Sequence, residues 1–567
     1  MKLRSFFYAL AAAVLVLLSI GAGGFYWLTS QSPIALLRGG STAAPAAAIF
    51  VPKQAPVMVS LLVNPTRLEA FRQLVAPPGE RRRSRAELNQ IQQTLLANLN
   101  LDYQRDIQPW IGDELTLAVT TLDIDRDRQN GLQPGYLLVA TTKNANKSRE
   151  FIQLFWQKQA LAGKDLVSEQ YKGVNLIYPN QPESAATGDS KFKTLATAAV
   201  GSRFVALANN PKVLRDAINN VQAPSQNLSD SPDYKLALEN LNAPRLGLTF
   251  VNIPGVLAWL GNSQASTTSQ KYESLALTLG LNPQGLLAQT SLIAAPDQEM
   301  TAKAPTLSKP VGALEYLPNS SALAAAGTNL NELWNQLSTA PKSAATSQLL
   351  DQFQRQIQAA WNIDLPSDVF SWVQGEYALG LLPSAEGTSP DWIFVAEKPA
   401  GATDSASIEH LDEVARVNGL SVGSLPLGNQ TITGWTKLIT SGGDGKDRSA
   451  IGIEAQVQGV HTTAGKYEIF TTSLEAMARA LDAPRNSLLA NGNFKQALAP
   501  LPAPNDGYLY IDWTSLQPSL ERHVPVLRVV ELIGEPLFSH LRAIAVSSYG
   551  SDVRVQRSKL FFRLGSG

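Results

Sequence analysis

Apolar residues recur along this chain with two periods, and each period predicts a different element. Alternating or unbroken apolar runs of strand length, bounded by polar turns, predict β-strands. These runs cover residues 57–63, 115–122, 135–141, 174–178, 197–208, 246–252, 275–281 and 286–293. Apolar side chains spaced three or four residues apart predict helices with one buried face. They occur at Leu88, Ile91, Leu95 and Leu99, and again at Leu350, Phe353, Ile357 and Trp361.

The predicted strands come mostly as consecutive pairs, with helices inserted between the pairs. Antiparallel strands can be joined by a short turn, whereas parallel strands need a long crossover. The pattern therefore favours an α+β fold, with helices packed on mostly antiparallel sheets, over a doubly wound parallel sheet.

Several passages of the chain occur twice, in the same order and about 260 residues apart. The passage 234–252 recurs as 494–512: both contain the pattern aromatic-Lys-x-Ala-Leu, then Ala-Pro, then Gly, then a short apolar run. Further matches join Phe50-Val51-Pro52 to Tyr316-Leu317-Pro318, Asn100-Leu101-Asp102 to Asn362-Ile363-Asp364, Trp110-Ile111 and Glu114 to Trp372-Val373 and Glu376, and residues 136–140 to 392–396. We interpret the chain as two tandem homologous α+β domains.

Composition places the domain boundaries. Residues 31–48 are rich in Gly, Ser, Ala and Pro, which is typical of a flexible tether. Residues 303–310 contain Pro305 and Pro310 between polar residues and form the predicted linker. The predicted domains are therefore a cytoplasmic stub with an anchor (1–30), the tether (31–48), the first repeat (49–302), the linker (303–310) and the second repeat (311–567).

The N-terminus carries the longest uncharged apolar run. Residues 6–28 have the length that a bilayer core requires, and Lys2 and Arg4 precede them. This pattern predicts a transmembrane helix with a cytoplasmic N-terminus and a body on the far side of the membrane. A cleaved signal peptide is the alternative, although the run exceeds the usual apolar core of such a peptide. The expected anchor residues are Phe6, Leu10, Leu15, Leu18, Tyr26, Trp27 and Leu28.

Composition also excludes classes of chemistry. The chain has no cysteine, which removes thiol nucleophiles and cysteine-based metal sites. Lys and Arg together number 47, as do Asp and Glu, so no net field attracts nucleic acid. We expect no nucleic-acid partner and no cofactor.

Three patterns that could support catalysis have a simpler explanation. Residues 419–423 fit the nucleophile elbow G-x-S-x-G, but a helix enters and a strand leaves, which is the reverse of the required order. Asp123, Asp125 and Asp127 alternate as in a calcium loop, but the glycine and the final carboxylate of that loop are missing. The four histidines have no metal-ligand spacing, and we interpret them as solvated surface residues. The sequence therefore predicts a protein that is not an enzyme, with no catalytic and no metal-binding residues.

Candidate contacts with a partner or ligand fall into two groups. Arg81, Arg82 and Arg83 form a dense basic cluster in a predicted loop, suited to a lipid headgroup or an acidic partner. An apolar stretch also occurs late in each repeat, at an equivalent place. Each stretch is either a buried core helix or an exposed binding surface. Their candidate contact residues are Val256, Leu257, Trp259, Leu260, Val526, Leu527, Leu537 and Phe538.

The anchor, the two repeats, the segment from Trp110 to Glu114 and the Tyr-Lys-x-Ala-Leu passages together resemble an uncharacterised family of single-anchor cyanobacterial membrane proteins with a duplicated domain of unknown function. The resemblance implies a periplasmic or thylakoid location and no established catalytic residue. Our first hypothesis is an extracytoplasmic, non-enzymatic binding or scaffold protein, which aids the assembly or maintenance of membrane complexes, including photosynthetic ones. The alternatives are a carrier or chaperone that holds a lipid or pigment in an apolar groove, and an unrecognised hydrolase.

Overall fold

The computed structural model describes most of the chain between residues 41 and 565. The described residues are 41–64, 101–180 (except 128 and 130), 195–259, 272–332 (except 283 and 301), 364–398 (except 384–389), 406–523 (except 442–451), 538 and 540–565.

The described strands divide into ten in the N-terminal half and ten in the C-terminal half. The first ten are β1 (Val57–Leu61), β2 (Ile111–Thr121), β3 (Gly135–Thr142), β4 (Leu166–Tyr171), β5 (Val174–Pro179), β6 (Ala196–Val200), β7 (Phe204–Ala208), β8 (Gly247–Asn252), β9 (Tyr272–Asn282) and β10 (Gly285–Ala294). The second ten are β11 (Leu323–Thr328), β12 (Glu376–Leu382), β13 (Asp391–Glu397), β14 (Ser421–Leu427), β15 (Gln430–Ser441), β16 (Gly452–Ala464), β17 (Tyr467–Thr471), β18 (Gly507–Asp512), β19 (Leu541–Ser551) and β20 (Val555–Leu564).

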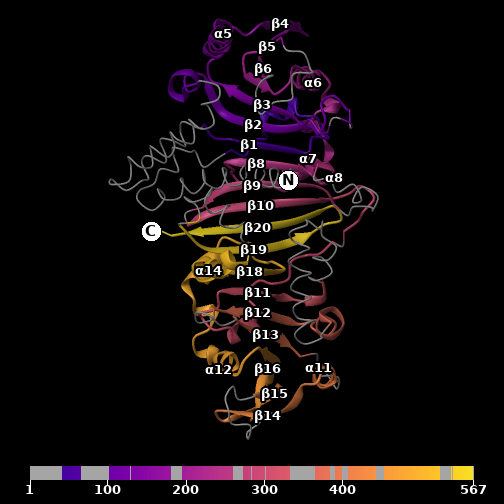
Figure 1. Cartoon of the computed structure of the whole chain (residues 1–567), viewed down its shortest axis with the longest axis vertical. Helices are drawn as coiled ribbons and strands as arrows, with labels where there is room; N and C mark the ends of the chain where they lie inside the picture. The colour runs from indigo at the N-terminus through magenta and orange to yellow at the C-terminus, as the bar shows by residue number, and fades with distance from the viewer. Residues whose placement is uncertain are drawn as a thin grey trace, which may run out of the picture.

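All of these strands belong to one twenty-stranded antiparallel sheet, which runs the length of the molecule (Figure 1). Its spatial order is β4-β5-β6-β7-β3-β2-β1-β8-β9-β10, then β20-β19-β18-β11-β12-β13-β17-β16-β15-β14. The second series repeats the pairings of the first in mirror order, so each strand pair of one half has a counterpart in the other.

The two halves meet where β10 pairs with β20. The register runs from Gly285 opposite Arg563 to Ile293 opposite Val555, so Gln289 opposite Lys559 lies at its centre. Each of these strands is the last of its half and would otherwise leave a row of unpaired backbone groups. Their pairing removes both free edges and makes the sheet continuous.

Helices cover one face of the sheet, which we call the core face and define by Met58, Phe250, Tyr510 and Phe561. This face is covered by α6 (Pro211–Gln222), α7 (Pro232–Glu239), α12 (Leu474–Asp482) and α13 (Gly492–Leu498). The opposite face carries α5 (Ala145–Leu161), α8 (Ile253–Trp259), α11 (Ala406–Val417) and α14 (Trp513–His523). Pro211 begins α6, where its missing N–H costs nothing.

The passages that match in sequence occupy matching places in the two halves. Tyr234 of α7 packs edge-to-face on Phe250 with ring centroids 5.2 Å apart. Phe494 of α13 packs in the same way on Tyr510 at 5.1 Å. Likewise, the N–H of Leu228 donates to Val51 O, and that of Leu488 donates to Leu317 O. The repeated residues therefore make the same core contacts.

The predicted fold class is wrong in two respects. We expected a transmembrane helix followed by two tandem α+β domains with mostly antiparallel sheets, but the molecule is mostly one antiparallel sheet that continues through both halves. In the described part of the chain, no helix has both the length and the apolar character needed to cross a bilayer. This finding contradicts the predicted anchor and the single-pass location derived from it. The expected anchor residues, Phe6 to Leu28, lie outside the described residues.

Candidate binding surface and polar clusters

The face of the sheet opposite the core face is apolar across both halves, and we call it the apolar face. Residues opposite each other on neighbouring strands point to the same side of a sheet. One such row contains only apolar residues from the first half to the second. It consists of Leu115, Leu61, Gly247, Leu279, Ala288, Leu560, Val546, Leu509, Ala325, Leu379, Phe394 and Phe470.

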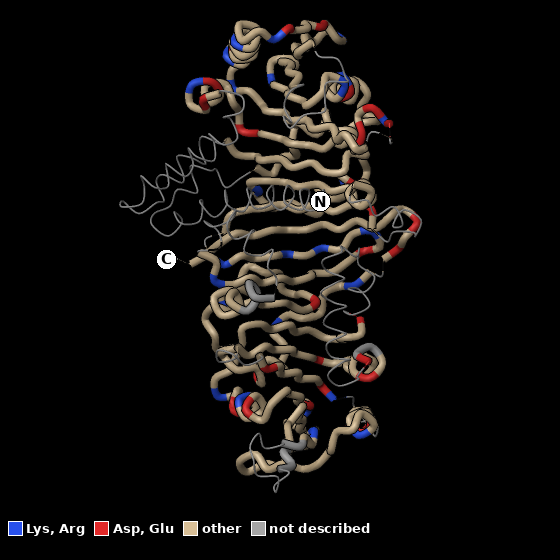
Figure 2. The backbone as a smooth tube through the Cα atoms, viewed as in Figure 1, with Lys and Arg blue, Asp and Glu red and all other residues tan. Residues whose placement is uncertain are grey.

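Four of the described helices pack on the apolar face. Helices α5 and α11 pack near the two ends of the sheet, and α8 and α14 pack nearer the middle. Between α5 and α8, the side chains of Leu117 and Tyr136 remain 45% and 40% exposed. Figure 2 shows few charged residues on the strands apart from β20, whereas charges are common on the helices and loops. Within the row, Leu61, Leu279 and Ala288 are buried, whereas the residues from Leu560 to Phe470 are half-buried. Apolar side chains that stay accessible to solvent mark a candidate interaction site.

The structure places part of the predicted contact set on this face. Val256, Leu257 and Trp259 belong to α8 and are half-buried, and Leu257 packs with Leu275 and Leu292 of the sheet. In the second half, Phe538 contacts Trp513 of α14, with ring centroids 5.3 Å apart. The other candidates lie outside the described residues: Arg81, Arg82, Arg83, Leu260, Val526, Leu527 and Leu537.

An aspartate-rich turn precedes the second strand of each half. In the first half, the N–H of Asp102 donates to the carboxylate of Asp106 at 2.9 Å, and Trp110 Nε1 donates to Asp106 O at 2.8 Å. In the second half, Asp364, Asp368 and Trp372 make the same two bonds at 2.8 and 3.0 Å. Both turns contain a short π-helix, η3 (Tyr103–Ile107) and η9 (Leu365–Phe370). The repeated Trp and Asp residues are therefore structural.

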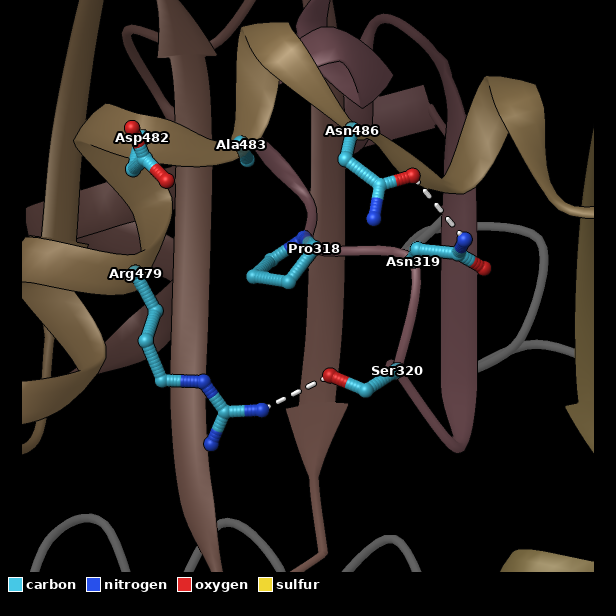
Figure 3. A pocket seen from close by; sticks show the side chains of 7 residues that line it. All are labelled: Pro318, Asn319, Ser320, Arg479, Asp482, Ala483 and Asn486. Atoms are coloured by element: carbon cyan, nitrogen blue, oxygen red, sulfur yellow. Dashed lines mark hydrogen bonds between the residues drawn. The ribbon is translucent and has the colours of Figure 1, made fainter.

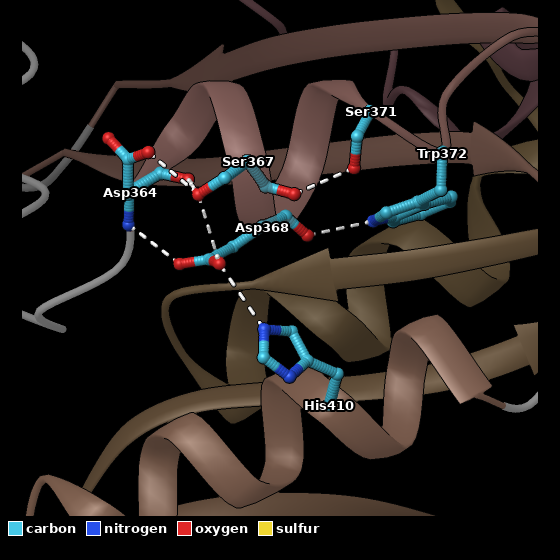
Figure 4. Close-up of polar contacts among 6 residues, drawn as sticks. All are labelled: Asp364, Ser367, Asp368, Ser371, Trp372 and His410. Atoms are coloured by element: carbon cyan, nitrogen blue, oxygen red, sulfur yellow. Dashed lines mark hydrogen bonds and ion pairs between the residues drawn. The ribbon is translucent and has the colours of Figure 1, made fainter.

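The two turns differ in what their second aspartate binds. Asp106 pairs with Arg105 at 2.9 Å, and this bond lowers the pKa of the Asp106 carboxyl to about 2. Asp368 instead accepts from Ser367 Oγ at 3.2 Å and lies 3.2 Å from His410 Nε2 (Figure 4). A serine nucleophile needs a base that takes its proton. Here the imidazole bonds to Asp368 rather than to the hydroxyl, so the cluster does not form a catalytic triad.

His461 contradicts the prediction that the histidines are solvated. Its side chain is buried, with Nδ1 2.8 Å from Glu468 Oε1 and Nε2 3.1 Å from Asp412 Oδ1. Burial lowers the pKa of this imidazole, but the hydrogen bonds and charges of Glu468 and Asp412 outweigh that effect and leave the pKa raised. The ring also stacks on Phe470 at 5.3 Å. The hydrogen bonds of His461 therefore join α11, through Asp412, to β16 and β17.

One pocket of the second half was not predicted from the sequence. It is an open cleft of about 420 Å³ between the end of α12 and the chain before β11 (Figure 3). Arg479 Nη2 donates to Ser320 Oγ at 2.7 Å, and Asn319 Nδ2 donates to Asn486 Oδ1 at 3.0 Å. The lining is therefore polar, and its side chains bond to one another. No sequence motif marks it, because its residues come from two segments far apart in the chain.

The pattern at residues 419–423 is a helix stop, as predicted. Helix α11 ends at Val417, and Gly419 has a φ of +78°, which glycine adopts without strain. The N–H of Leu420 then bonds to Ala415 O, closing the helix end before β14 begins at Ser421. Ser421 lies at the start of a strand and not on a nucleophile elbow.

The fold and this surface together define a strand-rich protein built from two like halves, with apolar residues along one face of its sheet. The chain belongs to the family described as "Protein of unknown function (DUF3352)", whose model matches residues 10–564. No protein with a curated description matches it.

Solved structures resemble the chain only weakly. Crystal forms I and III of TP0453 match with 10% sequence identity and TM-scores of 0.22 and 0.23. Each match covers 46% of this chain, and they cover 82% and 84% of the respective TP0453 chains. Crystal form IV matches with 11% identity, a TM-score of 0.22, and coverage of 44% and 80%.

Proposed function

We propose that this protein is a non-enzymatic binding or scaffold protein that holds a protein partner against its apolar face. The observation that carries the proposal is the apolar row that continues from the first half, through the seam between β10 and β20, into the second half. Burying apolar surface contributes about 25 cal/mol per Å², so burial of the residues of this face that are still accessible, among them Leu117 and Tyr136, favours association with a partner.

The polar clusters support this proposal over an enzyme. Ser367 and His410 each bond to Asp368, and His461 lies between Glu468 and Asp412. A catalytic group instead directs a free donor or acceptor towards a substrate. The polar groups of these two clusters thus support the fold, and we assign binding to the apolar face.

A site-specific photo-crosslinker tests the proposal. It is placed at Leu117, on the apolar face, and in a matched variant at Leu132, which is similarly exposed at 49% but lies in the loop between β2 and β3. In the native host, position 117 is expected to yield a discrete protein adduct and position 132 is not. Equal labelling at both positions, or none at either, would contradict the proposal.

The alternative function is a carrier of a lipid or pigment. The leucine and phenylalanine side chains of the apolar face favour it, because they suit an acyl chain or a ring system. Organic extraction of the purified protein distinguishes the two functions. A bound lipid or pigment at one equivalent per chain, displaced by the substitution Leu117→Glu, would replace the scaffold proposal with the carrier.

We also propose that the two halves arose by duplication and that the chain comes from a cyanobacterium. The repeated strand pairings and ring contacts support the first point, and the resemblance to cyanobacterial proteins supports the second. On this proposal, the partner belongs to the assembly or maintenance machinery of photosynthetic complexes. Identification of the adduct at position 117 by mass spectrometry tests this extension separately from binding itself.

A further inference from the structure

A second interaction surface lies at the far end of the second half, where β15 extends beyond its neighbour. Strand β14 pairs with β15 only from Gln430 to Thr436. Beyond that point, residues Lys437 to Ser441 pair with β16 on one side. On its other edge, the segment Lys437–Ser441 is not paired with any of the described strands. Such an edge presents backbone groups to any extended chain that approaches it.

Two side chains of this edge are apolar and exposed. Leu438 and Ile439 are 60% and 37% exposed. Because successive residues of a strand point to opposite faces, Leu438 and Ile439 provide an apolar neighbour on each face for an added strand.

The first half lacks this arrangement. There β5 is paired with β4 over its whole length, from Val174 opposite Tyr171 to Pro179 opposite Leu166. The outermost strand β4 also carries Glu169, which Arg215 holds at 2.7 Å. Charged residues on an edge strand discourage the addition of further strands. In the second half, the edge Lys437–Ser441 carries one charged residue, Lys437, next to the end of the pairing between β15 and β14, and the residues from Leu438 to Ser441 are uncharged.

We propose that the edge of β15 at Lys437–Ser441 binds an extended apolar segment of a partner protein as an additional β-strand. Backbone hydrogen bonds to an edge strand provide affinity, and neighbouring side-chain contacts provide selectivity. The short edge requires a segment of about five residues with alternating β-branched side chains. This surface is separate from the apolar face, so the inference goes beyond the proposed function and can fail independently of it.

The test uses the full chain and a fluorescein-labelled peptide, Lys-Thr-Val-Thr-Val-Thr-Lys, whose binding is followed by fluorescence anisotropy. The double variant Leu438→Glu, Ile439→Glu is expected to weaken binding at least about tenfold, a loss of about 1.4 kcal/mol. Leu161→Glu is the matched control, because Leu161 is 88% exposed at the end of α5 and away from the edge. It is expected to bind as the wild type does.

Amide NMR shifts locate the peptide. The proposal predicts that shifts are confined to β15, with contacts from peptide amides to residues 437–441. Absence of binding, equal binding by the double variant, or shifts centred on the apolar face would overturn it. Sedimentation provides one further result: if the wild type self-associates and the double variant does not, the occupant is a second copy and the partner proposal is wrong.

Discussion

Helices α5 and α11 occupy equivalent places on the apolar face, but different chemistry holds them there. In the first half, Trp156 of α5 donates from Nε1 to Thr197 Oγ1 of β6 at 2.7 Å. In the second half, Asp412 of α11 accepts from His461 of β16 and from Trp435 of β15. The strand pairings show that Thr197 and His461 are counterparts, because Thr197 lies opposite Leu207 and His461 opposite Phe470.

The same arrangement of helix and strands is therefore compatible with two kinds of contact between the helix and the sheet, one neutral and one ionic. The neutral one consists of a single hydrogen bond within an aromatic cluster that includes Trp110, Phe155 and Trp156. The ionic one places an imidazole between two carboxylates in a buried setting. A buried ionic group is costly to leave unpaired. The second helix should therefore be more sensitive to substitution and to pH than the first.

The largest effect is expected from His461→Ala. This change leaves Glu468, which is 3% exposed, and Asp412 without their shared cation. Breaking a buried pair in this way costs about 3–5 kcal/mol. Denaturant unfolding should show this loss in the free energy of unfolding. A change below about 1 kcal/mol would mean that the cluster is solvated.

Replacing the whole ionic cluster by its neutral counterpart should restore most of that loss. The strand register makes Thr197, Ala199 and Val205 the counterparts of His461, Thr463 and Glu468. We expect the variant Asp412→Trp, His461→Thr, Thr463→Ala, Glu468→Val to unfold within about 2 kcal/mol of the wild type, because apolar packing can replace a buried ion pair. If it is less stable than His461→Ala, the two kinds of contact are not interchangeable.

Alkaline pH should loosen α11 but not α5. The pKa of His461 is raised in the folded state, so its contribution is complete below the unfolded pKa of about 6.5 and is lost as pH rises through the folded pKa. Amide hydrogen exchange, corrected for intrinsic rates, should show lower protection of residues 406–417 at about pH 9 than at about pH 6. Residues 145–161 serve as the internal control and should keep their protection.

A moderate effect is expected from Thr197→Val. The change preserves shape but leaves the buried Trp156 N–H without its acceptor, which costs about 1–3 kcal/mol. Thermal unfolding measures the loss, and Trp156→Phe should recover part of it by removing the unpaired donor. No recovery would show that packing of the larger ring dominates at this site.

The smallest effect is expected from His410→Gln. The His410 side chain is 56% exposed, and its contact with Asp368 is 3.2 Å long. Exposed ion pairs contribute about 0–1 kcal/mol. We expect a change of at most about 0.5 kcal/mol, measured under the same conditions as His461→Ala. A larger change in the free energy of unfolding would mean that the contact between His410 and Asp368 stabilises the second half, for which the aspartate turn of the first half has no equivalent.

Local elements could be predicted from the sequence because they depend on nearby residues. The hairpin of β2 and β3 and the helix begun by Pro211 follow directly from apolar spacing and turn residues. The repeated pairs Tyr234–Phe250 and Phe494–Tyr510 lie at equivalent core positions, since the same spacing produces the same contact. By contrast, apolar character alone does not place Leu154, which is 49% exposed because Ile152 and Trp156 lie on the buried side of α5.

Contacts between distant segments could not be predicted in the same way. The pairing of β10 with β20 depends on which edges meet, and alternation along each strand is the same whether an edge is paired or free. His461 was missed because its two carboxylate partners come from a helix and a neighbouring strand. The signal that could have found it is its place in β16, next to the apolar residue Val460 and directly opposite Phe470.

The pair Gln289 and Lys559, at the centre of the pairing between β10 and β20, limits which halves can associate through their last strands. If a first half met another first half through its last strand, Gln289 would face Gln289, an arrangement without charge. Two second halves would instead bring two Lys559 ammonium groups together, and burial already lowers the pKa of this lysine. Joining the two unlike halves in one polypeptide thus fixes their ratio at one to one. It also places Lys559 opposite the uncharged Gln289, whereas a symmetric pair of second halves would place Lys559 opposite a second lysine.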